Sequence, residues 1–297
     1  MTLPELSRLY STEERCREYL KRLRWPEGPK CPRCASKRVT KLSANYKLEC
    51  AECQYQFTVL SGTVFHDTHL ALEKWFLAVT LMCESRKGIS ANQMKRLVGV
   101  SYKTAWYLCH RIRHAMQEVD QPKLEGTVEM DETYIGATAK AGFPTGRKRG
   151  RGAENKQIVI GIRERKGDLR FIHVQDVTSK TLREAALMNI APDAELIVTD
   201  EMASYPSALK GFSNHERIHH KTQYVAGIVH TNTVESAFSL LKRGIVGTWH
   251  RISAKHLPAY LDEMAFRFNR RNSTHLFEQV LRQMVMTENL TFEKLTA

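Results

Sequence analysis

The sequence predicts an α/β domain that follows a small cysteine-rich unit and a helical module. Three observations lead to this fold class: two CxxC pairs near the start, apolar residues with a helical period between 70 and 119, and short apolar strands mixed with helices between 127 and 200. Strands and helices that alternate in this way form a sheet with helices on both faces. At 297 residues the chain is long enough for two or more domains.

The charge of the chain indicates a polyanionic partner. The net charge is +13, and residues 1–120 carry 20 basic and 12 acidic side chains, whereas 121–230 carry 16 and 14. This balance favours nucleic acid first and a membrane surface second. Since the sequence has no run of 18 apolar residues and no apolar leader, we expect neither a membrane span nor export. The basic first part is the expected DNA tether, and the near-neutral middle is where metal-binding carboxylates are expected.

Four of the seven cysteines, Cys31, Cys34, Cys50 and Cys53, form the two CxxC pairs. Their separation fits a site in which four thiolates hold one zinc ion. Short strands are expected at 39–42, 46–48 and 55–59, and so small a sheet needs the metal for its folding. An odd cysteine count without an export signal argues against a disulfide framework. Redox-active or merely buried thiols are the alternative interpretation.

A helical module is expected next. Apolar spacing predicts a helix over 72–83, and Ser90 with Gln93 forms a capping-box pattern that opens a second, short helix. A turn at Gly99 leads to Ser101, which could cap a third helix. Short helix, tight turn and longer helix are the outline of a helix-turn-helix.

The outer side of this third helix carries the expected DNA contacts, with His110 beside them: Lys103, Tyr107, Arg111 and His114. Cationic and hydrogen-bonding side chains on one helix face suit a major groove and its phosphates. The alternative is a solvated basic face on an ordinary helical hairpin.

Two aspartates, Asp131 and Asp200, are expected at strand ends of the α/β domain, whose strands are predicted at 126–134, 157–162, 169–174 and 195–200, with a helix at 181–190. Open α/β sheets bind ligands at such an edge. Together with a third acid, the aspartates could hold two divalent ions for phosphoryl transfer. Acids at strand ends are also common as solvated turn residues.

A helix predicted from His230 to Gly244 supplies the third acid. Glu235 and Lys242 are seven residues apart, so they share one helix face, with a carboxylate for metal and a cation for the scissile phosphate. Asn232 and Glu235 also fit a capping box, in which Glu235 would only bond the start of the helix.

A basic insertion at 138–156 separates the first two strands of the α/β domain. We assign Arg147, Lys148 and Arg149 within it, together with Arg243, to contacts with DNA. A loop of this composition could also simply be solvated. The last fifty residues are expected to contain a core helix with a basic end and then a helical tail.

Four motifs follow one another along the chain. They are the CxxC…CxxC ribbon running into Phe57–Phe65, the sequence MDETYIG at 130–136, Thr199-Asp200 with Tyr205, and the sequence HTNTVESAFSLLKRG at 230–244. In this order they resemble the ISXO-type zinc-ribbon insertion-sequence transposases of bacteria, a DDE transposase family. The resemblance covers roughly residues 25–272.

The resemblance implies a ribonuclease-H-like catalytic domain with a mixed five-stranded sheet flanked by helices. It implies an acidic triad formed by Asp131, Asp200 and Glu235, with Lys242 as its basic companion. The expected domains are an N-terminal helix and zinc ribbon at 1–66, a helix-turn-helix-like DNA-binding module at 67–122, the catalytic domain at 123–275, and a C-terminal helical tail at 276–297.

The third metal ligand has alternatives in the sequence. Some members of the family carry an Asn near this position, which here is Asn232, and Glu132 and Glu201 stand beside the two aspartates. We choose Glu235 because an anionic oxygen binds Mg²⁺ more strongly than an amide oxygen does.

The function implied is that of a DNA transposase, which binds the terminal inverted repeats of its element and catalyses Mg²⁺-dependent strand cleavage and transfer into target DNA. One structural Zn²⁺ and two catalytic Mg²⁺ ions are expected, with Mn²⁺ as a substitute. One Mg²⁺ would activate water, and the other would stabilise the leaving oxygen. Because two DNA ends must be joined at once, we expect a homodimer or a larger synaptic assembly, in the bacterial cytoplasm at the nucleoid.

Two other functions fit the same residues. One is a non-enzymatic zinc-ribbon DNA-binding protein or an inactive transposase derivative. The other is a nuclease of related fold that cuts DNA and never joins it.

Overall fold

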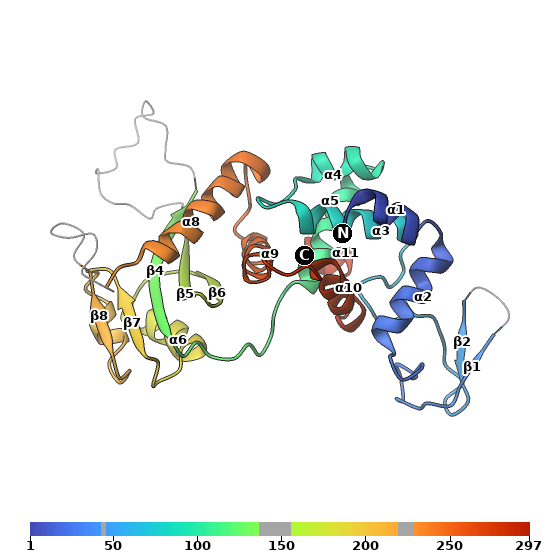
Figure 1. Ribbon diagram of the computed structural model, residues 1–297, viewed down its shortest axis with the longest axis horizontal. Helices are drawn as coiled ribbons and strands as arrows, with labels where there is room; N and C mark the ends of the chain where they lie inside the picture. Colours follow the sequence, from blue (N-terminus) through green and yellow to red (C-terminus); the bar gives the residue numbers. More distant parts are fainter. Residues whose placement is uncertain (43–45, 137–155, 219–228) are drawn as a thin grey trace. The chain divides into compact units, whose positions relative to one another are not determined.

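The computed structural model describes residues 1–42, 46–136, 156–218 and 229–297. These residues form two compact units (Figure 1): unit 1 contains 1–117 and 270–297, and unit 2 contains 118–269. Arg147, Lys148 and Arg149 lie outside the described residues. Within the part of the chain that is described, no helix combines the length and the apolar character needed to cross a membrane.

Unit 1 is helical apart from its ribbon. Its helices are α1 (Leu3–Leu9), α2 (Glu13–Arg24), α3 (Leu72–Glu84), α4 (Ala91–Val98), α5 (Tyr102–Ala115), α10 (Leu276–Met286) and α11 (Phe292–Thr296). The predicted helix-turn-helix outline is present. The Ser90 and Ser101 side chains cap α4 and α5, and Gly99, with φ of 66°, ends α4 in the left-handed conformation that glycine adopts without strain.

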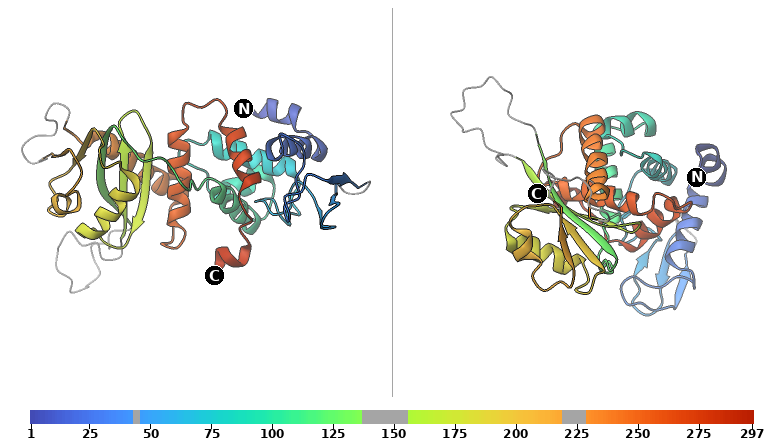
Figure 2. Two further views of the ribbon diagram at one scale, coloured as in Figure 1. Left: turned by 90° about the horizontal axis from the view of Figure 1, so that it is seen from below. Right: turned by 60° about the vertical axis from the view of Figure 1, so that its left-hand side comes forward.

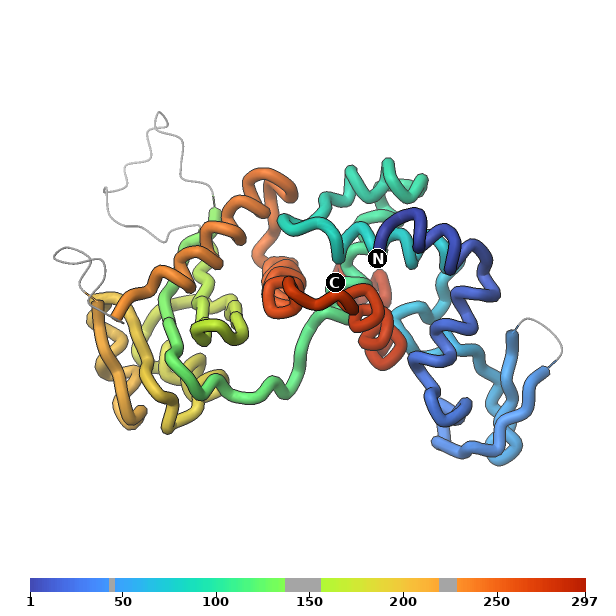
Figure 3. Tube along the Cα trace, viewed as in Figure 1, coloured from blue at the N-terminus to red at the C-terminus, as the bar shows by residue number. Residues whose placement is uncertain are grey.

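The C-terminal segment is part of the fold of unit 1. Helix α10 packs against α2, α3 and α5, and Val64 donates its backbone N–H to the carbonyl oxygen of Met284. In Figure 3 the red end of the tube lies among the blue and cyan helices. The segment at 276–297, expected as a tail, therefore completes the core that begins at the N-terminus.

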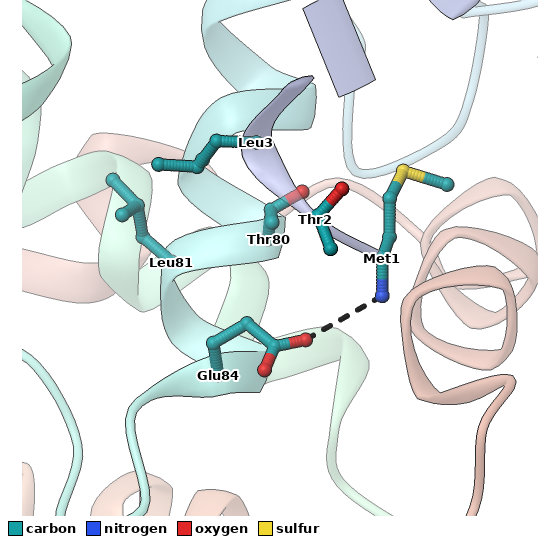
Figure 4. Close-up of a pocket in the computed structure, with 6 residues that line it drawn as sticks. All are labelled: Met1, Thr2, Leu3, Thr80, Leu81 and Glu84. Atoms are coloured by element: carbon teal, nitrogen blue, oxygen red, sulfur yellow. Dashed lines mark ion pairs between the residues drawn. The ribbon is translucent and has the colours of Figure 1, made fainter. Parts of the chain in front are cut away.

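The N-terminus of the chain rests on α3. The terminal ammonium of Met1 lies 3.6 Å from a carboxylate oxygen of Glu84, beside an open pocket whose lining is shown in Figure 4. This exposed ion pair contributes little to stability, because water and salt screen it.

The cysteine-rich segment forms a small antiparallel sheet. Its strands are β1 (Val39–Lys41), β2 (Leu48–Cys50) and β3 (Gln56–Phe57), in the order β1-β2-β3. The third strand is shorter than the predicted 55–59, because Thr58 already accepts and donates hydrogen bonds in a turn with Leu60 and Ser61.

Unit 2 is built on a mixed five-stranded sheet with the order β6-β5-β4-β7-β8. The strands are β4 (Thr127–Ile135), β5 (Gln157–Glu164), β6 (Leu169–Val174), β7 (Leu196–Thr199) and β8 (His215–Arg217). The first three strands pair antiparallel, and β7 and β8 run parallel to β4. The predicted α/β fold class, with a mixed five-stranded sheet behind a ribbon and a helical module, is confirmed. Strand β8 was not predicted, since three polar residues give no strand signal.

Helices cover both faces of this sheet (Figure 2). Helices α6 (Ser179–Asn189) and α7 (Tyr205–Ala208) pack on the face that presents Val128 and Met130. Helices α8 (Asn232–Gly244) and α9 (Leu257–Asn269) pack on the face that presents Val159 and Phe171. The chain leaves α8 through one π-helical turn, η1 (Ile245–Trp249).

The sequence predicts Asp131 at the end of a strand, and this is wrong. In the structure Asp131 is the middle residue of β4. Strand β7 stops at Thr199, whereas β4 continues to Ile135 because its other neighbour, β5, pairs with it along that whole length. The end of the shorter strand nevertheless meets β4 near Asp131.

Gly161 of β5 allows α8 to pack close to the sheet. It lies opposite Asp131 across the strand pair, and a Cβ atom at this position would come within 2.6 Å of the Phe238 ring and 2.8 Å of Val234. Any other residue at this position would push α8 away from the carboxylates on β4.

We therefore predict that Gly161→Ala destabilises unit 2 by about 1–3 kcal/mol, because overpacking forces side chains and backbone to shift. Hydrogen exchange of the β5 amides measures this locally. Gly247→Ala is the matched control, since nothing lies within 4 Å of a Cβ there. If the β5 amides were equally protected from exchange in the two variants, the packing of α8 would not depend on the missing side chain at Gly161.

Candidate active site

Three carboxylates meet where β7 ends beside β4. One oxygen from each of Asp131, Glu132 and Asp200 lies within 4.8 Å of the other two. The sheet register explains two of them: Glu129 pairs with Val198 in the parallel ladder, so Asp131 and Asp200 stand side by side two residues further along. The structure therefore brings the two predicted aspartates together.

Glu132 joins this cluster, although the sequence offered it only as an alternative. Its neighbour Tyr205 is fully buried and donates its hydroxyl to Glu132 Oε2 at 3.0 Å. The signal in the sequence was the Asp-Glu doublet together with Tyr205, but nothing in it showed that the two side chains meet. Glu201, the other alternative, is not one of the three clustered residues.

The cluster is electrostatically strained in the absence of a cation. Burial, together with the negative charges of Glu132, Asp200 and Glu235, raises the pKa of Asp131 to about 8. Burial also raises the pKa of Glu132, with the charge of Asp200 as the next cause. Oxygen ligands with uncompensated negative charge are those that Mg²⁺ or Mn²⁺ would neutralise.

Glu235 lies on the first turn of α8, close enough for its charge to act on Asp131 but outside the three-residue cluster. Its Oε1 accepts a hydrogen bond from the Thr231 hydroxyl at 2.8 Å. The capping box with Asn232 does not form, because α8 begins at Asn232 and its N-cap residue is Thr231. Glu235 and Lys242 are both exposed on this helix, as their spacing predicted.

A buried glutamate, Glu129, fixes the start of α8 to β4. Its Oε2 accepts the backbone N–H groups of Thr233 at 2.8 Å and Val234 at 3.0 Å. Its Oε1 accepts from Arg165 Nε at 2.7 Å and lies 3.2 Å from His230 Nδ1. A carboxylate at a helix N-terminus is favoured by the exposed N–H groups and the helix dipole. Sequence reasoning missed Glu129, whose only signal is an acid among apolar strand residues.

The four cysteines of the ribbon also converge, with all four Sγ atoms within 4.8 Å of one another. Cys31 Sγ lies 3.6 Å from Cys53 Sγ, and Cys34 Sγ lies 3.5 Å from Cys50 Sγ. Zinc bonded to four sulfurs at about 2.3 Å would separate them by about 3.8 Å, so the geometry fits a tetrahedral zinc site.

The expected DNA-contacting face of α5 is largely covered, and the predicted outer position is wrong for Arg111 and His110. Arg111 is only 4% exposed and donates Nη2 to the carbonyl oxygen of His66 at 2.7 Å, while His110 is buried. Both face the interior of unit 1, so neither can reach DNA without unfolding.

The C-terminal segment covers most of the rest of α5. The Tyr107 hydroxyl donates to the carbonyl oxygen of Leu290 at 2.6 Å, and its ring meets Phe292 edge to face. His114 is half-buried, which lowers its pKa. Lys103 alone of the four assigned residues is exposed, with its ammonium 4.5 Å from the centre of the Phe292 ring. Arg243 is exposed on α8 of unit 2.

A four-cysteine ribbon, a helix-turn-helix-like module and a mixed sheet that carries clustered carboxylates are the parts expected of a zinc-ribbon DDE transposase. Comparison with known families agrees, since the ISXO2-like transposase domain matches residues 123–269 and the transposase zinc-ribbon domain matches 11–56. The chain belongs to this ISXO2-like transposase family.

A curated relative extends over nearly the whole chain. It is described as an uncharacterized protein in transposable element ISH50 of Halobacterium salinarum strain NRC-1 and is 31% identical over 275 residues, which are 87% of this chain and 91% of the relative. Two solved structures, the Mos1 strand transfer complex and a pre-cleavage Mos1 transpososome, each match 73% of this chain and 78% and 79% of theirs. Both are 12% identical to this chain, with TM-scores of 0.32 and 0.27.

Stability of unit 2 should depend on pH through Asp131. Its folded-state pKa of about 8 lies above the unfolded value of 3.8, so the folded state binds more protons, and stability is lost as pH rises from about 4 to 8. Thermal unfolding of the zinc-loaded protein without Mg²⁺ measures this loss. Mg²⁺ at 100 times its Kd should restore about 2.7 kcal/mol, and Asp131→Asn should flatten the pH dependence. A flat profile in the wild type would contradict the assignment.

Replacing Glu129 should loosen α8. We predict that Glu129→Gln costs about 3–5 kcal/mol, because it leaves the partly buried Arg165 without its fully buried carboxylate partner. Hydrogen exchange of the α8 amides is the measurement. Glu195→Gln, an exposed change, should stay within about 0.5 kcal/mol. If the α8 amides exchange equally slowly in the two variants, the buried carboxylate of Glu129 does not hold the helix.

Proposed function

We propose that the protein is an active DNA transposase that binds the terminal inverted repeats of its insertion sequence and catalyses Mg²⁺-dependent strand cleavage and strand transfer into target DNA. The observation that carries this proposal is the convergence of Asp131 and Asp200 from two parallel strands, next to a helix that bears Glu235 and Lys242. Family membership supports the reaction class.

Asp131, Asp200 and Glu235 would hold two Mg²⁺ ions, for which Mn²⁺ can substitute. When bound, such a pair supplies an activated water and stabilises the leaving oxygen of an in-line displacement. Glu132 lies close enough to contribute an oxygen, and Asn232 is exposed one turn before Glu235 as the alternative third ligand. The raised pKa of Asp131 supports the assignment, since a cation would relieve the repulsion that causes part of it.

The chain's own groups would position the DNA end. Lys242 extends from the face of α8 that also carries Glu235, so its ammonium would hold a phosphate next to the cut bond. Glu129 fixes the helix that bears both residues, and Tyr205 orients Glu132. The 3′-hydroxyl released by cleavage would then attack a target phosphodiester from the same position.

The ribbon would bind one structural Zn²⁺ through Cys31, Cys34, Cys50 and Cys53 and, with the helical module, hold the terminal repeats. Lys103, Arg243 and the basic insertion carrying Arg147, Lys148 and Arg149 remain proposed DNA contacts. Because two element ends are joined in one reaction, we propose a homodimer or a larger synaptic assembly, acting in the bacterial cytoplasm at the nucleoid.

Strand transfer tests the proposal directly. Labelled duplexes that copy the DNA flanking the gene are incubated with protein, target DNA and Mg²⁺, and cut and joined products are counted. Asp131→Asn and Asp200→Asn should each reduce both products by on the order of 10³-fold, because the metal site loses an anionic ligand. Asp193→Asn, an exposed acid of unit 2, is the control and should retain activity.

The same assay separates the alternatives. Binding without cutting would indicate a non-enzymatic DNA-binding protein or an inactive derivative. Cutting without joining would indicate a nuclease. Activity that is indifferent to Asp131→Asn would contradict the proposed site.

A further inference from the structure

We infer that duplex DNA binds unit 1 across α4, the loop before it and the first turn of α5, rather than along the length of α5. This inference rests on the proposed function and names the surface that would carry it. We call this surface the basic α4 surface; it consists of Arg86, Lys87, Asn92, Gln93, Lys95, Arg96, Tyr102 and Lys103.

The sequence of this region is strongly one-sided in charge. From 85 to 117 it contains seven Lys or Arg and no Asp or Glu. Five of the seven cations are exposed, and all five belong to the basic α4 surface. The other two, Arg111 and Arg113, are buried. A patch of one sign on a folded surface attracts a polyanion such as the phosphate backbone.

The cations of this surface lack the carboxylate partners that some exposed cations of unit 1 have. Arg38 and Arg282, for example, form ion pairs at 2.9 and 3.1 Å. No ion pair involves the five cations of the basic α4 surface among the residues that the structure describes. Phosphates could therefore replace water around them without first breaking a salt bridge.

Helix α4 presents its polar side chains on one face. At 100° per residue, Lys95, Asn92, Arg96 and Gln93 fall within an arc of about 160°. Met94 and Val98, on the opposite side, are buried in unit 1. The exposed arc combines cations, which contact phosphates, with amides, which can hydrogen-bond to phosphates or base edges.

The turn places the start of α5 beside this face. Gly99 has φ of 66°, and its carbonyl oxygen accepts from Lys74 Nζ at 3.2 Å, which holds the turn against α3. Tyr102 is 49% exposed, and Lys103 is exposed beside it. In helix-turn-helix proteins the first residues of the second helix contact base edges, while the first helix crosses the backbone.

The remainder of α5 cannot lie in a groove. Arg111 is buried, and Tyr107 is covered by Leu290 and Phe292 from the C-terminal segment. Reading of DNA is therefore restricted to the first turn of α5, and α4 supplies the phosphate contacts.

Salt-dependent binding of the full-length protein to a labelled random-sequence DNA duplex tests the surface. Each phosphate contact contributes about 0.9 to the slope of log K against log salt concentration. The double variant Lys95→Ala/Arg96→Ala should reduce the magnitude of this slope by about 2 and weaken binding. Lys180→Ala/Lys210→Ala removes the same charge from exposed sites of unit 2 and should leave the slope unchanged. Tyr107→Phe, which removes a hydroxyl and no charge, should leave the affinity unchanged.

Melting temperatures of all variants are compared with that of the wild type, so that a loss of binding is not a loss of folding. A wild-type slope in Lys95→Ala/Arg96→Ala, or weaker binding by Tyr107→Phe with an unchanged melting temperature, would contradict binding at the basic α4 surface. If strand transfer by the wild type is intact in that case, the proposed function stands and only the surface is wrong. A wild-type protein with no salt-dependent affinity for duplex DNA would overturn both.

Discussion

The site in unit 2 depends on a contrast between two carboxylates of β4, Glu129 and Asp131. They lie two residues apart on the same face of the strand but have opposite electrostatic surroundings. Glu129 is fully buried and satisfied by Arg165, His230 and two helix N–H groups. Among the residues that the structure describes, Asp131 accepts a hydrogen bond only from the backbone N–H of Glu132, and burial together with the charges of Glu132, Asp200 and Glu235 raises its pKa to about 8. Asp131 is therefore the less compensated of the two carboxylates, and it is the one to which we assign the proposed metal ions.

The compensated glutamate also determines where α8 begins. Glu129 bonds the first turn of the helix, and Gly161 on the adjacent strand removes the side chain that would hold the helix away. Glu235 lies on that same first turn, and Lys242 lies two turns further along. The positions of both exposed residues are therefore consequences of buried contacts that do not themselves touch DNA.

Much of this could be predicted from the sequence, because the signals were local. The CxxC spacing predicted the thiolate cluster, the apolar runs predicted β5, β6 and β7 within two residues, and the Ser90 and Ser101 caps predicted α4 and α5. What the sequence could not show depends on contacts between distant segments. Arg111 looks like a surface residue until His66 and Trp75 are placed around it. Tyr107 is covered by residues about 180 positions away. Glu132 enters the cluster because Tyr205 reaches it from α7, and Asp131 lies in mid-strand because β5 pairs beyond the end of β7.

The central claim is that Asp131 and Asp200 share divalent cations. Crystals of the protein grown with Mn²⁺ and measured at the manganese absorption edge test it most directly, since anomalous scattering locates the metal without any assumption about activity. The account predicts anomalous density within bonding distance of both aspartate carboxylates. Density that occurs only elsewhere, with Asp131 and Asp200 bound to nothing but water and protein, would contradict it.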